Sequence, residues 1–452
     1  MNKASFLGED PVSSLLWKFS LPAVTGMLVG ALYNVIDSIF VGRGVNELAL
    51  TAVTVAFPIM TILMAVGMLV GVGAATLVSL YLGQKKQDLA EKILGNAVTM
   101  MIFFVFITTS LALYFLDPLL INVLGVTPEV LPYAHDFTSV ILLGSVFFHV
   151  GFGLNNVIRA QGDPRTALAT QVIAAIINGI LNYIFIFHWN MGIKGSAFAT
   201  ICAQAFAAIW VMTYFIRGKG LLKLHMSDLK IKQKLMLSIM KLGLAPFSMQ
   251  LGASAVMVVL NLQIQAYGGV LAVAAFGIVN RILMLVMMPV AGISQGSQPI
   301  MGYNYGAKQY DRVLETLSKA ILISTLICLA GFAVVECFPG KIIAVFNEEP
   351  QLIALGSTGL QVFLCLMPII GFQIIGANYF QAIGKAYYSI LFNTLRQIIV
   401  LIPLVFLFSH LWGLTGIWAA GPVSDLASAL VTAFCLRKDI KRLKSKIAKP
   451  AM

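Results

Sequence analysis

The sequence predicts an all-α membrane protein with twelve transmembrane helices in two pseudo-symmetric six-helix bundles. Three observations support this fold class. The 452 residues are 59% hydrophobic and only 11% charged, whereas soluble domains are about one quarter charged. Apolar runs of roughly 20 residues or more, each long enough to cross a bilayer as a helix, recur along the whole chain. The second half of the chain also repeats the first.

Breaks at glycine, proline and charged residues define the spans in order. The first run follows Glu9 and Asp10 and lacks a small-residue cleavage site, so we expect a retained helix rather than a cleaved signal peptide. Short polar stretches such as QKKQDLAEK after the second run and RAQGDPR after the fourth separate later runs. The predicted spans are residues 15–42, 49–82, 93–116, 132–157, 166–188, 195–216, 242–267, 270–303, 315–338, 352–381, 387–409 and 414–436.

The basic residues predict the orientation of these spans. On one side, the loops hold only Arg43, Lys194 and Lys341, and Arg281 and Arg396 lie inside spans. The rest of the 30 Lys and Arg residues lie on the other side, and cytoplasmic loops carry such an excess. We therefore expect a multi-pass protein of the inner (plasma) membrane with both termini cytoplasmic. The net charge of +12 is dispersed between apolar runs, which argues against a nucleic-acid partner.

Matched stretches spaced by about 221–224 residues indicate an internal duplication. They are KFSLPAVTGM with KLGLAPFSMQ, LYLGQKKQDLAEK with YNYGAKQYDRVLE, RAQGDPRTAL with QAIGKAYYSI, and MGIKGSAFAT with WGLTGIWAAG. Parallel repeats of this kind are typical of secondary transporters, with the substrate site between the halves. We expect an N-terminal bundle over 1–216, a linker over 217–241, a C-terminal bundle over 242–436 and a basic cytoplasmic tail over 437–452. The linker is either a cytoplasmic-surface helix or a solvated segment.

Asp37 is the main candidate for a functional residue, because a carboxylate inside a membrane is costly and usually functional. Counting 1.5 Å per residue from the predicted outer ends places Asn182 and Thr200 at its depth, and Asn178 one turn deeper. Carboxylate, amide and hydroxyl oxygens can hold a monovalent cation, so Asp37, Asn178 and Asn182 form a possible sodium site. Without a metal ion, burial favours the protonated carboxyl, and Asp37 would bind a proton reversibly. Helix packing through neutral polar groups is the structural alternative.

The motifs YNVIDSIFVG, ALTAVTVAFPI, RAQGDPR and NGILNYIF followed by GIKGSAFAT resemble the MATE family of multidrug and toxic-compound extruders, in its bacterial multidrug branch. The resemblance covers nearly the whole chain. It implies two bundles around a central cleft and export of organic cations driven by sodium ions or protons. It also implies a cation site at Asp37, Asn178, Asn182 and Thr200. Some relatives have Asp at the position of Asn182, or acids in spans seven and ten, and this chain has neither.

Several other residues are candidates for the substrate cavity or for movement. Tyr33, one turn before Asp37, would line the cavity or pack a neighbouring helix. Asn155 matches a polar position of the family. Met64 and Met288 belong to methionine stripes, which suit promiscuous apolar ligands but also pack helices or meet lipid. Pro22 would act as a hinge, because proline weakens the helical hydrogen-bond ladder.

Three further charged residues lie near mid-depth in the predicted spans. An unpaired charge is costly there, so we expect Asp425 to pair with an arginine, and with Arg396 rather than Arg281 because spans eleven and twelve are consecutive. Such arginines are also compatible with the alternative function, a flippase for lipid-linked saccharides. The sequence contains no nucleophile triad, HExxH or Walker motif, so we do not expect an enzyme. We expect a monomer with no cofactor other than the coupling ion, with organic cations and the bilayer as its partners.

Overall fold

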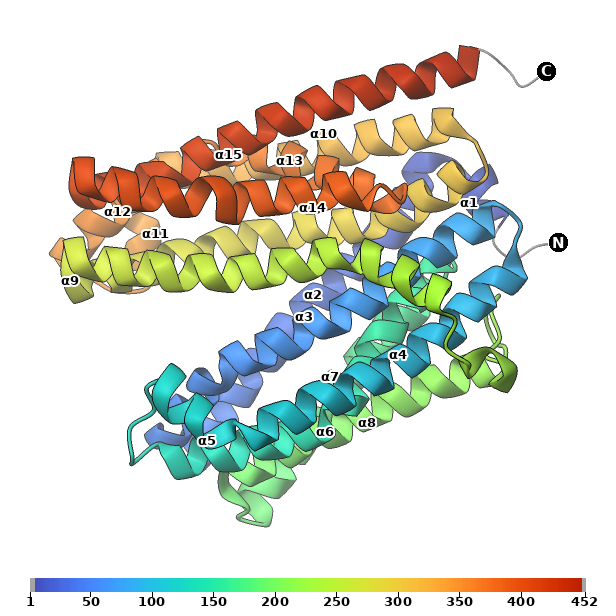
Figure 1. The fold of residues 1–452 in the computed structure, drawn as a ribbon. Coiled ribbons are helices and arrows are strands. Elements are labelled where there is room, and N and C mark those ends of the chain that lie inside the picture. The colour runs from blue at the N-terminus through green and yellow to red at the C-terminus, as the bar shows by residue number, and fades with distance from the viewer. Residues whose placement is uncertain (1–4, 449–452) are drawn as a thin grey trace. The chain divides into compact units, whose positions relative to one another are not determined.

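The computed structural model describes residues 5–448, which are almost entirely helical and contain no strand (Figure 1). The first half contains α1 (Phe6–Glu9), α2 (Val12–Gly44), α3 (Glu47–Gly83), α4 (Gln87–Tyr114), α5 (Leu116–Pro118), the π-helical turn η1 (Leu119–Val123), α6 (Leu131–Ala160), α7 (Pro164–Tyr183), the π-helical turn η2 (Ile184–His188), α8 (Gly192–Ile216) and the 3-10 turn η3 (Met226–Leu229). The second half contains α9 (Gln233–Gly306), α10 (Tyr310–Cys337), α11 (Pro339–Ala344), α12 (Pro350–Leu364), α13 (Met367–Ala382), α14 (Ala386–Thr394), the π-helical turn η4 (Leu395–Leu401) and α15 (Ile402–Ala448).

The helices agree with the predicted membrane-spanning fold. Within residues 5–448, nine helices are long and apolar enough to cross a membrane, or ten when α12 and α13, bent by 46°, count as one span. Two of these are unusually long, and each is broken by a glycine with positive φ, Gly269 in α9 and Gly413 in α15. Both breaks fall where the sequence predicts a turn between spans. Dividing the two long helices there gives twelve segments, which is the predicted number.

The backbone also supports the internal duplication. Left-handed backbone conformations occur at matched places in the two halves: Lys85 and Lys308 have φ of 59° and 61°, and Gly192 and Gly413 have φ of 60° and 59°. Gly162 and Gly384 also both have positive φ, at 108° and 80°. Because this conformation is uncommon away from turns and helix ends, its recurrence indicates that the same turns end equivalent helices in both halves.

The described residues form two compact units that differ from the expected domain boundaries. Unit 1 contains Thr25–Phe247 and the described residues before Gly8, and unit 2 contains Gly8–Val24 and the described part of Ser248–Met452. The first part of α2 therefore belongs to unit 2. The reason is close packing on the second part of α9, because a Cβ on Gly296 would lie 2.7 Å from the Cα of Ser20. Only a glycine allows this approach.

The predicted linker lies in unit 1, and its residues 217–232 form the short 3-10 turn η3 and irregular segments rather than a surface helix. Residues 217–232 run along α4, and α9 begins at Gln233. The buried amide of Asn96 donates a hydrogen bond to the carbonyl of Asp228 (3.3 Å) and accepts one from the backbone N–H of Lys232 (2.7 Å). Thr99 donates to the carbonyl of Leu229 (2.7 Å). The described part of the predicted tail is also ordered, since α15 continues to Ala448.

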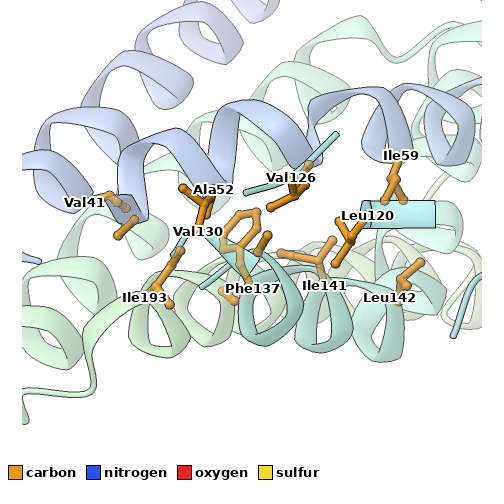
Figure 2. Packing of buried hydrophobic residues seen from close by; sticks show 14 of the residues in the cluster. Val41, Ala52, Ile59, Leu120, Val126, Val130, Phe137, Ile141, Leu142 and Ile193 are labelled. Carbon is orange, nitrogen blue, oxygen red and sulfur yellow. The ribbon is translucent and has the colours of Figure 1, made fainter. Parts of the chain in front are cut away.

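A cluster of apolar side chains fills the predicted outer end of unit 1 (Figure 2). Side chains from α2, α3, α6 and α8 meet those of η1, and Phe137 on α6 is almost fully buried. Val41 lies one turn beyond Asp37 on α2, and Ile193 lies two turns before Thr200 on α8. This core therefore fixes the two helix ends that hold the candidate site.

Candidate functional site

The candidate site is centred on the carboxylate of Asp37, which is buried in α2. One of its oxygens, Oδ1, accepts two hydrogen bonds: from Nδ2 of Asn182 on α7 (2.8 Å) and from Oγ of Ser196 on α8 (2.9 Å). Three helices that are distant in sequence thus meet at one carboxylate oxygen. The hydrogen bonds cover only part of the carboxyl group, because Oδ2 accepts none from the described residues.

A chain of polar side chains extends from this carboxylate. The Asn182 amide also donates to Oδ1 of Asn178 (2.9 Å), one turn earlier on α7. Asn178 donates to Oγ1 of Thr200 on α8 (3.3 Å), and the Tyr33 hydroxyl donates to the same oxygen (3.1 Å). The structure therefore brings together all four residues predicted around the cation, and it joins Tyr33 to them.

Two glycines bring the three helices this close together. α7 ends directly after Asn182, and the wider π-helical turn η2 follows. A Cβ on Gly44, at the end of α2, would lie 2.4 Å from Ile186 in η2, and one on Gly195 would lie 3.1 Å from the backbone of Phe185. An added Cβ would overlap Ile186 at Gly44 and would be tight at Gly195, so α2 and α8 both pack closely on η2. Ser196 follows Gly195 and consequently reaches Asp37.

Ser196 is the site residue that the sequence reasoning missed. It is fully buried, and it precedes Thr200 by four residues, so both lie on one face of α8. That spacing was the available signal. Counting depth from the predicted helix ends placed Thr200 level with Asp37, but the hydroxyl at that level in the structure is Ser196, one turn earlier on α8.

The electrostatics of the site favour binding of a positive charge. Among the described residues, no Lys, Arg or His forms an ion pair with Asp37. An ionised carboxylate at this depth therefore has hydrogen-bond donors but no compensating cation, which is unfavourable in a membrane. Binding of a proton or a metal cation removes that cost.

The available donor atoms fit a sodium ion or a proton. Oδ1 of Asn182 is buried without a hydrogen-bond partner, and Oδ2 of Asp37 is also uncommitted. Both are hard oxygen ligands of the kind that alkali and alkaline-earth cations prefer. No group of three His, Cys, Asp or Glu residues that could hold a metal ion occurs in the part of the chain described. The arrangement therefore does not resemble a zinc or iron site.

The other predicted residues lie outside this polar chain. Asn155 is buried and donates to the carbonyl of Ala167 (3.0 Å), a contact that packs α6 on α7. Met64 in unit 1 and Met288 in unit 2 are half-buried. Pro22 lies inside α2, two residues before the boundary between the two units.

The expected intramembrane ion pair is present in unit 2. Nε of Arg396 lies 2.7 Å from Oδ1 of Asp425. Arg281 is exposed and forms no ion pair with any residue in 5–448.

The chain has many apolar spans arranged as two repeats, and one repeat holds a buried carboxylate among polar groups. This combination is characteristic of a membrane transporter. Comparison with known proteins identifies its family. The MatE family model matches residues 22–184 and again residues 247–407, one match in each repeat. The chain belongs to the MATE family of transporters, and it is accordingly a transporter rather than an enzyme.

Individual relatives support this assignment along the full length of the chain. The multidrug export protein MepA of Staphylococcus haemolyticus (strain JCSC1435) is 26% identical over 430 residues, covering 95% of this chain and 94% of MepA. The MATE multidrug transporter DinF-BH, solved in complex with rhodamine 6G, is 38% identical with a TM-score of 0.87, covering 94% of this chain and 95% of that one. A MATE structure in a bent conformation, 24% identical, has the same fold with a TM-score of 0.92 and covers 99% of each chain.

Proposed function

We propose that this transporter exports small organic cations across the plasma membrane by antiport with sodium ions or protons. One observation carries the coupling proposal: Asp37 is buried and accepts hydrogen bonds from two other helices, and it has no cationic partner in the described chain. The names of the relatives support the choice of substrate, since MepA is a multidrug exporter and DinF-BH was solved with rhodamine 6G. These relatives favour drug export over the flippase alternative.

In this proposal the coupling ion controls the packing of α2 against α7 and α8. When a sodium ion or proton neutralises Asp37, the hydrogen bonds from Asn182 and Ser196 lose their charged acceptor and weaken. Pro22 provides a bend, because it removes one backbone hydrogen bond from α2 close to the point where the helix passes from one unit to the other. The ion-bound and drug-bound forms then favour different bends of α2, and this difference produces alternating access. We place both termini in the cytoplasm and treat the functional form as a monomer.

Ion gradients imposed separately on proteoliposomes test this proposal. With rhodamine 6G as the transported dye, a tenfold gradient of the coupling ion supplies about 1.4 kcal/mol per ion. For one-to-one exchange it should sustain a dye gradient of up to about tenfold. We expect either the sodium gradient or the proton gradient to drive uptake, and dissipating that gradient to stop it. Dye movement at the same rate with and without each gradient would contradict coupled antiport.

Replacing Ser196 by alanine should change the affinity for the coupling ion. The substitution removes one of the two hydrogen bonds to Asp37, and such bonds to charged groups are worth about 1.5–3 kcal/mol. We expect the half-saturating ion concentration of transport to shift roughly tenfold. Because this donor stabilises the charged carboxylate, its loss should tighten the binding of the cation that neutralises Asp37.

Ser38→Ala is the matched control for this substitution. Ser38 adjoins Asp37 but donates only to the backbone carbonyl of Asn34 on its own helix (2.8 Å). Its removal should leave the half-saturating ion concentration unchanged. An equal shift in both variants would mean that Ser196 has no special relation to the coupling ion.

A further inference from the structure

The part of α15 that follows the last predicted span has a positively charged side. α15 continues as a helix to Ala448 (Figure 1), and after residue 436 its sequence reads RKDIKRLKSKIA. Leu436, Asp439 and Leu443 are buried and mark the packed side of this helix. Four exposed basic residues lie on the opposite side and form a surface that we call the basic face: Arg437, Lys438, Lys441 and Lys444.

The basic face carries no negative charge of its own. Asp439 is the one acidic residue after position 436 in the sequence, and it is buried on the packed side. There it pairs with Lys385 and accepts a hydrogen bond from the hydroxyl of Tyr379 (2.8 Å). Within residues 5–448, no cation of the basic face forms an ion pair. Their charge is therefore available to an anionic ligand.

The basic face continues a stripe of α15 that faces lipid. Leu430 and Phe434 are 63% and 73% exposed, and we call these two residues the lipid-facing stripe. Exposed apolar side chains of this size on a membrane-spanning helix meet the acyl chains of the bilayer. Arg437 and Lys441 follow Phe434 by three and seven residues, so they lie on the same side of the helix. The basic face therefore points toward the lipids and not into the protein.

The start of α14 shows that the basic face lies at the edge of the hydrocarbon core. The pairing of Lys385 with Asp439 sets the start of α14 level with the start of the basic face. Tyr387 is 74% exposed two residues later, and tyrosine is enriched where the hydrocarbon meets the headgroups. The basic face extends over about 10 Å of helix, which is comparable with a headgroup layer of roughly 5–8 Å.

We propose that the basic face binds the phosphate groups of anionic phospholipids in the adjoining leaflet. Lys and Arg clusters directly after a membrane-spanning helix attract such lipids. The bound lipid would place an acyl chain along the lipid-facing stripe and its phosphate between Arg437 and Lys441. Arginine can donate two parallel hydrogen bonds to phosphate oxygens, and lysine adds a second positive charge. Lipid binding at this surface depends on neither the transported substrate nor the coupling ion.

Native mass spectrometry of the detergent-solubilised transporter tests this proposal. The protein is titrated with dioctanoyl phosphatidylglycerol, which is anionic, or with dioctanoyl phosphatidylcholine, which has no net charge. The key variant is Arg437→Gln with Lys441→Gln. Its matched control is Arg442→Gln with Lys446→Gln, which also removes one arginine and one lysine spaced by four residues on the same helix. This second pair lies on another side of α15, where Nζ of Lys446 is 5.4 Å from the ring centre of Tyr310.

The key variant should lose affinity for the anionic lipid alone. Each basic residue near an anionic surface strengthens binding about fivefold, so we expect phosphatidylglycerol to bind about tenfold more weakly or worse. Binding of phosphatidylcholine should not change, and the control variant should bind both lipids as the wild type does. Lys438→Gln with Lys444→Gln should also weaken phosphatidylglycerol binding. All substituted side chains are exposed, so the thermal midpoints without lipid should agree with that of the wild type.

Three results would overturn the proposal. Equal affinity of the wild type for the two lipids would show that the negative charge is not recognised. Equal weakening by the key and control variants would show that total charge matters and the basic face does not. Displacement of phosphatidylglycerol by an equal concentration of inorganic phosphate would show that the surface binds free phosphate rather than lipid.

Discussion

Asp37→Asn should reduce ion-driven dye transport to the rate of vesicles without protein, while the protein stays folded. Asparagine has nearly the same shape, and its carbonyl oxygen can still accept the hydrogen bonds from Asn182 and Ser196. The packing of the three helices is thereby retained, so the free energy of unfolding should change by no more than about 1 kcal/mol. The lost property is the negative charge, without which the site has nothing to neutralise. Transport under an imposed ion gradient and the thermal unfolding midpoint measure the two effects.

The control for this result removes a carboxylate of unit 1 that lies outside the site. Asp136 is exposed and pairs with Lys194 at 3.1 Å, and exposed pairs of this kind contribute little. Asp136→Asn should therefore transport dye at the wild-type rate. Undiminished gradient-driven transport by Asp37→Asn would remove Asp37 from the coupling mechanism.

Gly243→Ala should strongly destabilise unit 1. A Cβ on Gly243 in α9 would lie 1.6 Å from the carbonyl oxygen of Leu69 in α3, and backbone atoms cannot move aside as a flexible side chain can. Gly73 meets the carbonyl oxygen of Ile239 in the same crossing, at 2.2 Å from its added Cβ. The helices would have to separate, at a cost of about 3 kcal/mol. The thermal midpoint should fall by roughly 6–12 °C, measured on the purified protein.

Gly277→Ala gives the matched comparison, because Gly277 also lies inside α9 and an added Cβ meets nothing within 4 Å. Alanine favours a helix by about 0.5–1 kcal/mol over glycine. This variant should melt at or above the wild-type temperature. If the two alanine variants melt alike, the close crossing of α3 and α9 is not what stabilises unit 1.

The positions of the spans could be predicted because bilayer thickness fixes the length of an apolar helix. The turns at Gly269 and Gly413 followed from the same argument, since each lies between two adequate apolar runs. The level of Asp37 with Asn182 could be estimated because helices rise uniformly from their ends, whereas Thr200 contacts Tyr33 and Asn178, one turn deeper than predicted. The length of a span and the depth of a residue within it are properties of single helices, so both can be estimated directly from the sequence.

Properties that depend on contacts between helices were not predictable in this way. Ser196 reaches Asp37 because Gly195 packs against the π-helical turn η2, and no sequence pattern predicts that turn. The first part of α2 joins unit 2 because Gly296 lies against Ser20, far away in the sequence. The hydrogen bonds that hold residues 228–232 on α4 were likewise not predictable, because Asn96 and Thr99 look like ordinary helix residues in the sequence.

Direct measurement of ion binding tests the central claim, that Asp37 and its neighbours bind and release the coupling ion. Equilibrium binding of radioactive sodium, together with proton uptake in weakly buffered solution, is measured on wild type and Asp37→Asn. We predict about one ion bound per wild-type molecule, displaced when rhodamine 6G is added because ion-bound and drug-bound forms exclude each other. The variant should bind none. Equal ion binding by the two proteins would contradict the assignment of the coupling site to Asp37.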